Sequence, residues 1–341
     1  MNRPVRQPRR ALHGVILLDK PLGLSSNDAL QKVRRLMRAE KAGHTGTLDP
    51  LATGLLPLCF GAATKFSQVS LDADKAYRAT LKLGQTTTTG DAEGTVLDTR
   101  PVTSERVNPE SIKSACRQLT GDIDQVPPMY SALKHAGRAL YEYAREGIEI
   151  EREPRRVTIH GIDIVSWHDD ELIIDVRCSK GTYIRTLAQD LGELLGVGAH
   201  LTGLRRTASG GLSIGGAVTF DALQNMTEAQ RDAILAPVDV LLAEWPEVTL
   251  SESEAARFLT GLRRRVALPD QPQVRVYGPR PGQPLEAGER VLLGSAHIKG
   301  GELIPTRLLS PDEVQSLLIQ VSSSATPSAQ PEVGERSVPV V

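Results

Sequence analysis

The sequence has little of several features that would each indicate a class of protein. Aromatic residues make up 4% of the 341 residues, so any ring that stacks on a ligand must be one of a few. The three cysteines, Cys59, Cys116 and Cys178, lie far apart and form neither a Cys-x-x-Cys pair nor a Cys/His spacing for zinc. A disulfide framework or a metal site is therefore not expected, and isolated thiols favour a cytoplasmic location.

Long apolar runs and an excess of positive charge are also missing. No segment is long enough to cross a bilayer, and the basic first residues are not followed by the apolar stretch of a signal peptide. The formal net charge is −1, whereas many nucleic-acid binders carry a clear positive excess. Basic residues nevertheless cluster locally, in residues 31–41 and 263–265. Any one such cluster taken alone is best explained as a solvated face.

The length of the chain predicts more than one domain, because single cores seldom grow past about 250–300 residues. Residues 14–245 mix strand and helix patterns and predict the larger domain. Short strands separated by Gly and Pro turns predict a small β-rich domain over 246–312. Residues 1–13 are expected to be a flexible basic N-terminus. Residues 321–341, rich in Ser and Pro, are expected to be a disordered tail.

Periodicity predicts individual elements within the larger domain. Residues 14–21 are typical of a buried strand that stops at a proline, and residues 75–87 alternate like a strand. Residues 171–186 are expected to be strand and residues 186–196 an amphipathic helix. Residues 126–156 mix Lys, Arg, Tyr and Glu with little core periodicity, which predicts a protruding arm.

The stretch GHTGTLDPLATGLLP, residues 43–57, is the most unusual in the chain. Pro50 biases Asp49 toward extended geometry. Gly43 and Gly46 permit sharp turns and the close approach of another molecule. The backbone is thus expected to present Asp49 on a loop. Local propensity alone favours a plainer alternative, in which Asp49 is a turn residue bonded to its own backbone.

This stretch resembles the catalytic motif of the TruB family of tRNA pseudouridine synthases, and four more motifs follow the family's order. They are DKPLGLSSND (19–28), KAYRATLKLGQTTTTGDAEG (75–94), VPPMYSALKHAGRALYEYAREG (126–147) and CSKGTYIRTLAQDLG (178–192). The resemblance covers about residues 14–310. It implies a mixed α+β fold: a catalytic domain with a central mixed, mainly antiparallel sheet flanked by helices, and a C-terminal PUA-like domain.

The resemblance also implies a role for each matching residue. Asp49 matches the catalytic aspartate of an isomerase that converts uridine to pseudouridine at position 55, in the T-loop of tRNA. His44 matches the residue that enters the RNA where the target base has left, and Tyr77 matches the tyrosine stacked on the flipped uracil. Arg185 matches the partner of the aspartate. The pocket residues and the residue that supports the loop are, by the same resemblance, Tyr183, Leu204 and Lys20.

Chemistry supports these implied roles. Isomerising uridine breaks the C1′–N1 bond, turns the base and rejoins it through C5, so no redox step and no cofactor are needed. A carboxylate that acts on the nucleoside must stay ionised although its pocket is apolar, and a guanidinium partner favours the charged form. We therefore expect an ion pair between Asp49 and Arg185. Without the resemblance, Arg185 could equally be a surface arginine, and Tyr77 a core tyrosine.

RNA binding is expected from the arm, which contains Lys134, Arg138, Arg145, Arg155 and Arg156. The implied partner is the T-arm of tRNA, bound by a monomer that needs no guide RNA, no obligate protein partner and no membrane. Guide-dependent relatives usually carry long basic tails, whereas this tail has one arginine, Arg336. The alternative is a non-catalytic RNA-binding or RNA-folding protein that uses the same cleft. The presence of Asp49, Tyr77 and Arg185 favours the enzyme.

Overall fold

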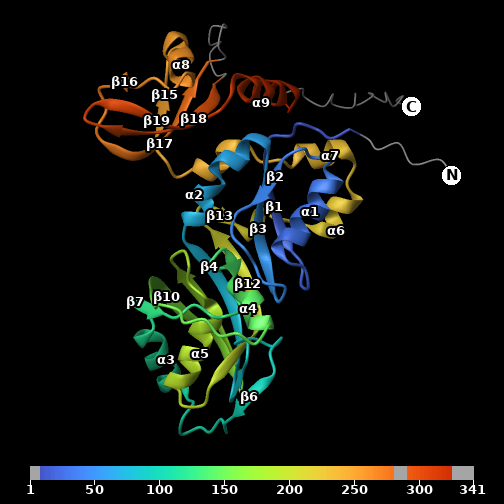
Figure 1. The fold of residues 1–341 in the computed structure, drawn as a ribbon, viewed down its shortest axis with the longest axis vertical. Helices are drawn as coiled ribbons and strands as arrows, with labels where there is room; N and C mark the ends of the chain where they lie inside the picture. Colours follow the sequence, from blue (N-terminus) through green and yellow to red (C-terminus); the bar gives the residue numbers. More distant parts are fainter. Residues whose placement is uncertain (1–7, 280–289, 325–341) are drawn as a thin grey trace, which may run out of the picture. The chain divides into compact units, whose positions relative to one another are not determined.

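The computed structural model describes residues 8–279 and 290–324. The chain divides into two compact units, residues 1–244 and 245–341, and Figure 1 shows the elements of each. Within the described residues, no helix is both long and apolar enough to cross a membrane.

The first unit is built on a ten-stranded sheet with the order β14-β1-β3-β12-β4-β11-β10-β7, to which β2 adds beside β3 and β13 beside β12. Two of its pairings, β1 with β14 and β3 with β12, are parallel, and the other pairings in the described residues are antiparallel. The predicted mixed, mainly antiparallel sheet is therefore confirmed. Its strands are β1 (Gly14–Lys20), β2 (Ala42–His44), β3 (Ala52–Phe60), β4 (Lys75–Leu83), β7 (Gly121–Gln125), β10 (Arg155–His168), β11 (Glu171–Cys178), β12 (Ala199–Ser209), β13 (Leu212–Ser213) and β14 (Val218–Thr219).

Helices and two small hairpins complete this unit. The hairpins pair β5 (Gln85–Thr87) with β6 (Val96–Thr99), and β8 (Lys134–His135) with β9 (Arg138–Ala139). The α-helices are α1 (Ser26–Leu36), α2 (Ser67–Asp72), α3 (Pro109–Gln118), α4 (Leu140–Arg145), α5 (Ile184–Leu194), α6 (Phe220–Asn225) and α7 (Glu228–Ala233). The 3₁₀ helices are η1 (Gly61–Phe66), η2 (Ile214–Gly216) and η3 (Val238–Leu242).

Two apolar cores lie along the sheet. One packs α1 against β1 and β3, and the other packs α3 and α5 against β4, β11 and β12. In Figure 1, α1, α6 and α7 accordingly lie near β1, and α3 and α5 lie near β10. Tyr77 on β4 and Leu204 on β12 pack against both cores. The two residues therefore mark the place where the two halves of the sheet meet.

In its described residues, the second unit contains a five-stranded sheet with the order β15-β17-β18-β19-β16 and two helices. A β-rich C-terminal unit was predicted, and this part of the prediction is confirmed. Its elements are β15 (Glu247–Thr249), α8 (Glu252–Leu259), β16 (Arg264–Arg265), β17 (Gln271–Gly278), β18 (Val291–Lys299), β19 (Glu302–Leu308) and α9 (Pro311–Ser324).

Three expectations about elements need correction. The predicted strand over 171–186 ends at Cys178, and Arg185 lies in the first turn of α5. Ile184, Leu187, Ala188 and Leu191 are buried at helical spacing, and this pattern outweighs the short alternation in Tyr183–Ile184–Arg185.

The predicted disordered tail begins too early, because residues 321–324 belong to α9. Ser310 and Glu313 form reciprocal hydrogen bonds at the start of that helix, over 2.7 and 3.2 Å, which is a capping box. Residues 325–341 lie outside the described residues.

The last part of the supposedly flexible N-terminus is attached to the first unit. Leu12 is buried, and the backbone of Arg10 bonds to Arg38 and Glu40. The guanidinium of Arg10 pairs with Asp232. Residues 1–7 lie outside the described residues.

Candidate active site

Asp49 lies on a loop, residues 46–55, that leads from β2 into the first residues of β3; we call it the Asp49 loop. Strands β2 and β3 pair in antiparallel register, and the amide of Thr45 donates to the carbonyl of Pro57 over 3.1 Å. Gly46 then adopts φ of +87°, which is accessible to glycine without strain. Asp49 projects from this loop with 43% of its side chain exposed.

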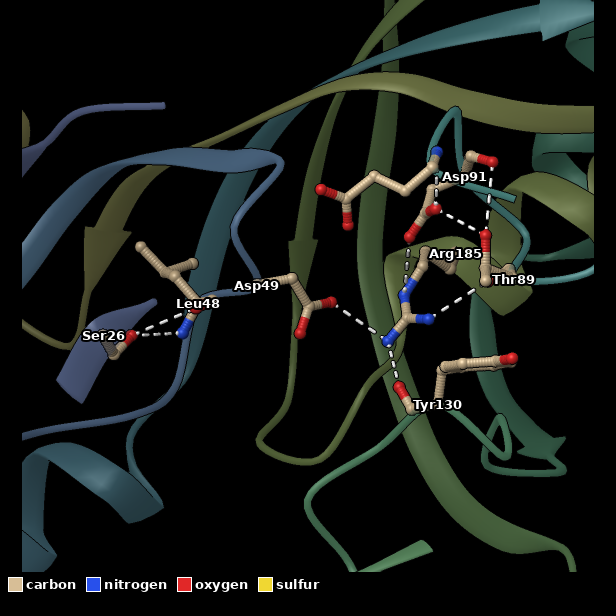
Figure 2. A network of polar contacts seen from close by, with 8 residues as sticks. Ser26, Leu48, Asp49, Thr89, Asp91, Tyr130 and Arg185 are labelled. Carbon is tan, nitrogen blue, oxygen red and sulfur yellow. Dashed lines mark hydrogen bonds and ion pairs between the residues drawn. The ribbon is translucent and has the colours of Figure 1, made fainter. Parts of the chain in front are cut away.

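The Asp49 loop is held by α1. The hydroxyl of Ser26, in the first turn of α1, accepts a hydrogen bond from the amide of Leu48 over 2.7 Å and donates to the Leu48 carbonyl over 3.2 Å. Figure 2 shows this reciprocal pair next to Asp49. Both Ser26 and Leu48 are buried, so water cannot easily compete for these hydrogen bonds.

Arg185 is buried, and its guanidinium faces Asp49 (Figure 2). Its Nη2 lies 3.0 Å from Oδ2 of Asp49, so the predicted ion pair is present. The remaining donors are engaged elsewhere: Nη1 donates to the carbonyl of Thr89 over 3.0 Å, and Nη2 also donates to that of Tyr130 over 2.6 Å. Asp49 therefore contacts one nitrogen of the guanidinium, Nη2.

A second carboxylate, Asp91, shares Arg185 with Asp49. Its Oδ2 lies 3.7 Å from Nε of Arg185. Its Oδ1 accepts from the hydroxyl of Thr89 over 2.6 Å and from the amide of Glu93 over 3.1 Å. Asp91 is only 3% exposed, whereas Asp49 is accessible. Arg185 thus joins a buried, hydrogen-bonded carboxylate to one that can meet a substrate.

A cavity of about 350 Å³ opens in front of this pair. The predicted site residues that line it are Asp49, Tyr77, Tyr183, Arg185 and Leu204. Residues of the arm complete the wall, among them Ser131 and Leu133. Within residues 8–279 and 290–324, no three His, Cys, Asp or Glu side chains are grouped so that they could hold a metal ion.

The two cavity tyrosines come from different elements. Tyr77 lies on β4, and burial raises the pKa of its hydroxyl while the neighbouring Arg206 opposes that rise. Burial likewise raises the pKa of Tyr183. Tyr183 stands just before α5, where the buried amide of Gln125 bonds both its N–H, over 3.0 Å, and its carbonyl, over 3.4 Å. Both hydroxyls are therefore neutral, and Gln125 fixes the backbone of Tyr183 at the wall of the cavity.

Lys20 and His44 do not line the cavity. Lys20 is fully buried at the end of β1 and donates to the carbonyls of Pro21 and Leu24. Burial lowers its pKa to about 8. The turn that Lys20 organises touches the Asp49 loop, because the amide of Gly23 donates to the carbonyl of Pro50 over 2.9 Å.

His44 is half-buried at the end of β2. Burial lowers its pKa, and the positive charge of Arg206 acts in the same direction. Its Nδ1 is buried and has no hydrogen-bond partner among the described residues. The ring is thus held in the neutral state beside the Asp49 loop.

The basic residues of the arm differ in whether their charges are exposed or paired with nearby acids. Lys134, Arg145 and Arg155 are exposed, and Arg145 lies over the ring of Tyr141 at 5.2 Å. Arg156 is exposed but lies 3.5 Å from Asp124. The other arginine of the predicted RNA-binding set, Arg138, pairs with Glu142 and Glu146 and lies 4.6 Å over the ring of Tyr143. The charge of Arg138 is therefore largely used within the arm.

Sequence reasoning missed three charged residues of this site. Asp91 is part of the GDAEG turn and carried a usable signal, an acid between two glycines. Arg206 and Lys75 both line the cavity and are both buried. Lys75 donates to the carbonyls of Ser70, Leu71 and Ala73 at the end of α2. No residue pattern marks these two cations, since their partners are backbone carbonyls, which any residue type supplies.

Comparison with known proteins places this geometry in a family. A model described as TruB family pseudouridylate synthase (N terminal domain) matches residues 34–184, and one described as tRNA pseudouridylate synthase B C-terminal domain matches residues 185–243. The chain is 57% identical to tRNA pseudouridine synthase B of Cupriavidus pinatubonensis, over 90% of this chain and 98% of that protein. This chain belongs to the TruB family of pseudouridylate synthases. A protein of the same name from Ralstonia nicotianae is 56% identical, with 90% and 98% coverage.

Solved structures agree on the fold. The crystal structure of a Cbf5-Nop10-Gar1 complex contains a chain that superposes with a TM-score of 0.66 at 24% identity, covering 89% of this chain and 87% of that one. A chain in a structure of an H/ACA RNP bound to a substrate RNA containing 2′-deoxyuridine superposes with a TM-score of 0.65 at 22% identity, covering 89% and 88%. The TruB-family chain thus has the pseudouridine-synthase fold that the sequence predicted.

Proposed function

We propose that this TruB-family chain converts uridine to pseudouridine at position 55 of the T-loop of tRNA, as a stand-alone enzyme with Asp49 as its catalytic group. Relatives over 50% identical along nearly their whole length are named tRNA pseudouridine synthase B, which supports tRNA as the substrate. The observation that carries the proposal is the placement of Asp49 at the cavity, 3.0 Å from the buried Arg185.

The reaction requires a carboxylate that can act on a nucleoside and then help to remove the C5 proton. Nucleophilic and acid–base work can be combined in one ionised carboxylate. Arg185 places a cation 3.0 Å from the Asp49 carboxylate, and such a partner offsets part of the cost of removing a carboxylate from water when a substrate closes the cavity. Asp91 holds the other side of the guanidinium, at 3.7 Å. Arg185 is therefore kept in place when Asp49 engages a substrate.

The base must leave its stack to reach Asp49. Flipping a nucleotide costs a few kcal/mol, and stacking on a protein ring returns about 1–3 kcal/mol per base. Tyr77 is proposed to stack on the uracil, with Tyr183 and Leu204 forming the rest of the pocket. His44 is a flat, neutral ring at the edge of the same loop and is proposed to fill the vacated position in the RNA. Lys20 supports the Asp49 loop through the turn at Gly23.

Affinity for tRNA is proposed to come from the arm and from the C-terminal unit. Lys134, Arg145 and Arg155 present charges that can meet phosphates, and phosphate contacts supply most of the salt-dependent binding energy. We propose that residues 246–312 act as a PUA-like RNA-binding domain. The expected monomer, the absence of a guide RNA and of an obligate protein partner, and the cytoplasmic location remain predictions.

The proposal is tested with purified protein and unmodified tRNA transcribed in vitro, with no guide RNA present. We expect one uridine of the T-loop, at position 55, to be converted, as mapped by chemical labelling of pseudouridine. Conversion at another site would contradict the position, and conversion only after a guide RNA is added would contradict stand-alone action. Tight binding of tRNA without any pseudouridine would support the RNA-folding alternative.

A further inference from the structure

Arg206 is a fully buried arginine beneath the Asp49 loop. It lies on β12, is only 1% exposed and lines the cavity. Its neighbour Arg205 has a different environment, because it is partly exposed and forms a two-bond ion pair with Asp19 over 3.0 and 2.7 Å. Two consecutive arginines on one strand therefore have distinct roles, and the role of Arg206 needs its own explanation.

The guanidinium of Arg206 bridges the start and the end of the Asp49 loop. Its Nε donates to the carbonyl of Leu55 over 2.7 Å, and its Nη2 donates to the carbonyl of Gly46 over 3.2 Å. The backbone bond from Thr45 to Pro57 lies just outside these two carbonyls. Beyond that bond the two sides of the hairpin separate, and Arg206 connects them across the gap.

Gly46 allows this close contact. A Cβ atom at position 46 would lie 3.2 Å from Nη1 of Arg206, and the φ of Gly46 is +87°. A side chain there would be strained and would press on the guanidinium. The loop backbone therefore rests directly on Arg206.

The charge of Arg206 is not neutralised by a neighbouring acid. In the described parts of the chain, no carboxylate lies within 4.0 Å of it. A buried charge without such a partner is expensive to remove from water. The stability of the fold alone therefore does not explain why an arginine occupies this position. Its hydrogen bonds to two carbonyls of the Asp49 loop explain it specifically.

We propose that Arg206 is a positioning residue that holds the carbonyls of Gly46 and Leu55 and so fixes the place of Asp49 opposite Arg185. Its catalytic consequence rests on the proposed function, but the clamp itself is a property of the free protein. Lysine at this position would keep the charge, yet its single Nζ cannot replace the planar fork that spans two carbonyls.

The test compares Arg206→Met and Arg206→Lys with the wild-type protein and with the matched control Arg205→Met. The first readout is hydrogen exchange of the amides in residues 46–55 of the free protein, which reports local opening. The second is the single-turnover rate of pseudouridine formation at saturating tRNA, with the Kd for tRNA measured separately. If Arg206→Met does not fold, Arg206→Gln takes its place, since it keeps a neutral donor of similar length.

We expect faster exchange in residues 46–55 for both Arg206 variants and a rate reduction of about 100-fold, the effect of a misplacement of about 1 Å. The Kd should change by less than about threefold, because positioning acts on the reaction and not on RNA affinity. Arg205→Met should match the wild type in all three measurements.

Full activity of Arg206→Lys would show that charge alone matters and would overturn the clamp. Unchanged exchange, or a Kd that worsens in step with the rate, would overturn it too. If the wild type makes no pseudouridine, the proposed function fails, and the exchange data still decide whether the clamp exists.

Discussion

The Asp49 loop and the arm differ in how they are held. The loop is fixed by buried groups on three sides: Ser26 on Leu48, Arg206 beneath both ends and Arg185 opposite the carboxylate. In the arm, residues 126–156, charges are exposed or paired with other exposed side chains. Exposed ion pairs contribute little to stability, whereas hydrogen bonds in a dry interior hold a geometry firmly. The Asp49 carboxylate is thus placed rigidly, and the exposed charges of the arm stay adaptable.

A clear fall in the reaction rate is expected when the rigid region is disturbed at Arg185. Arg185→Lys keeps a positive charge but removes the fork that serves the carbonyls of Thr89 and Tyr130. Removal of two hydrogen bonds of about 1 kcal/mol each corresponds to roughly a 30-fold fall in the single-turnover rate. The matched control is Arg78→Lys, at an exposed two-bond pair with Asp175, where the change should be smaller than about twofold. Equal effects at the two sites would remove the distinction between a buried and an exposed arginine.

A smaller effect, on binding alone, is expected from the arm. Lys134→Ala combined with Arg155→Ala should weaken tRNA binding by about tenfold. The slope of log K against log salt should fall by about 1 for each phosphate that the variant no longer neutralises. The rate at saturating tRNA should stay within about twofold. Lys113→Ala on α3, outside the arm, serves as the control. A fall in the saturated rate without a change in slope would place these residues in the reaction and not in binding.

The smallest effect concerns stability and pH at Lys20. Burial lowers the pKa of Lys20 in the folded protein to about 8, whereas the usual value is 10.5. Between these values the unfolded chain binds more protons than the folded one, so this group makes folding more favourable as pH rises from about 8 to 10.5. The wild type should therefore gain stability relative to Lys20→Met between pH 7.5 and pH 9.5 in urea unfolding experiments. A difference in unfolding free energy that does not change over this range would contradict the lowered pKa.

The local pattern of apolar and polar residues was sufficient to predict much of the fold. Alternation in residues 75–83 and the apolar run in residues 14–20 predict β4 and β1, because each strand has a buried face that its own sequence displays. Periodicity was misleading around Arg185, where three residues of apparent alternation belong to the first turn of α5. A window that short cannot distinguish a strand from the start of a helix.

The site was predictable only in part. The Asp49–Arg185 pair was expected from residue chemistry and family resemblance, and it is present. Arg206 is about 150–160 positions away in the chain from its acceptors, Gly46 and Leu55. The acceptors are backbone carbonyls, which every residue has, so the amino-acid types at these positions do not reveal the contact. Such a contact follows from the pairing of β12 with β3, which sequence periodicity does not specify.

The most direct test of the account is the single-turnover rate of Asp49→Asn with unmodified tRNA, measured beside its Kd. Asparagine keeps the size of the side chain but removes the negative charge that faces Arg185. We predict that the rate falls by about 10³-fold or more, as expected for the removal of a group in covalent or acid–base catalysis. The Kd for tRNA should stay close to that of the wild type. A variant that still forms pseudouridine at a near-normal rate would contradict the central role of this carboxylate.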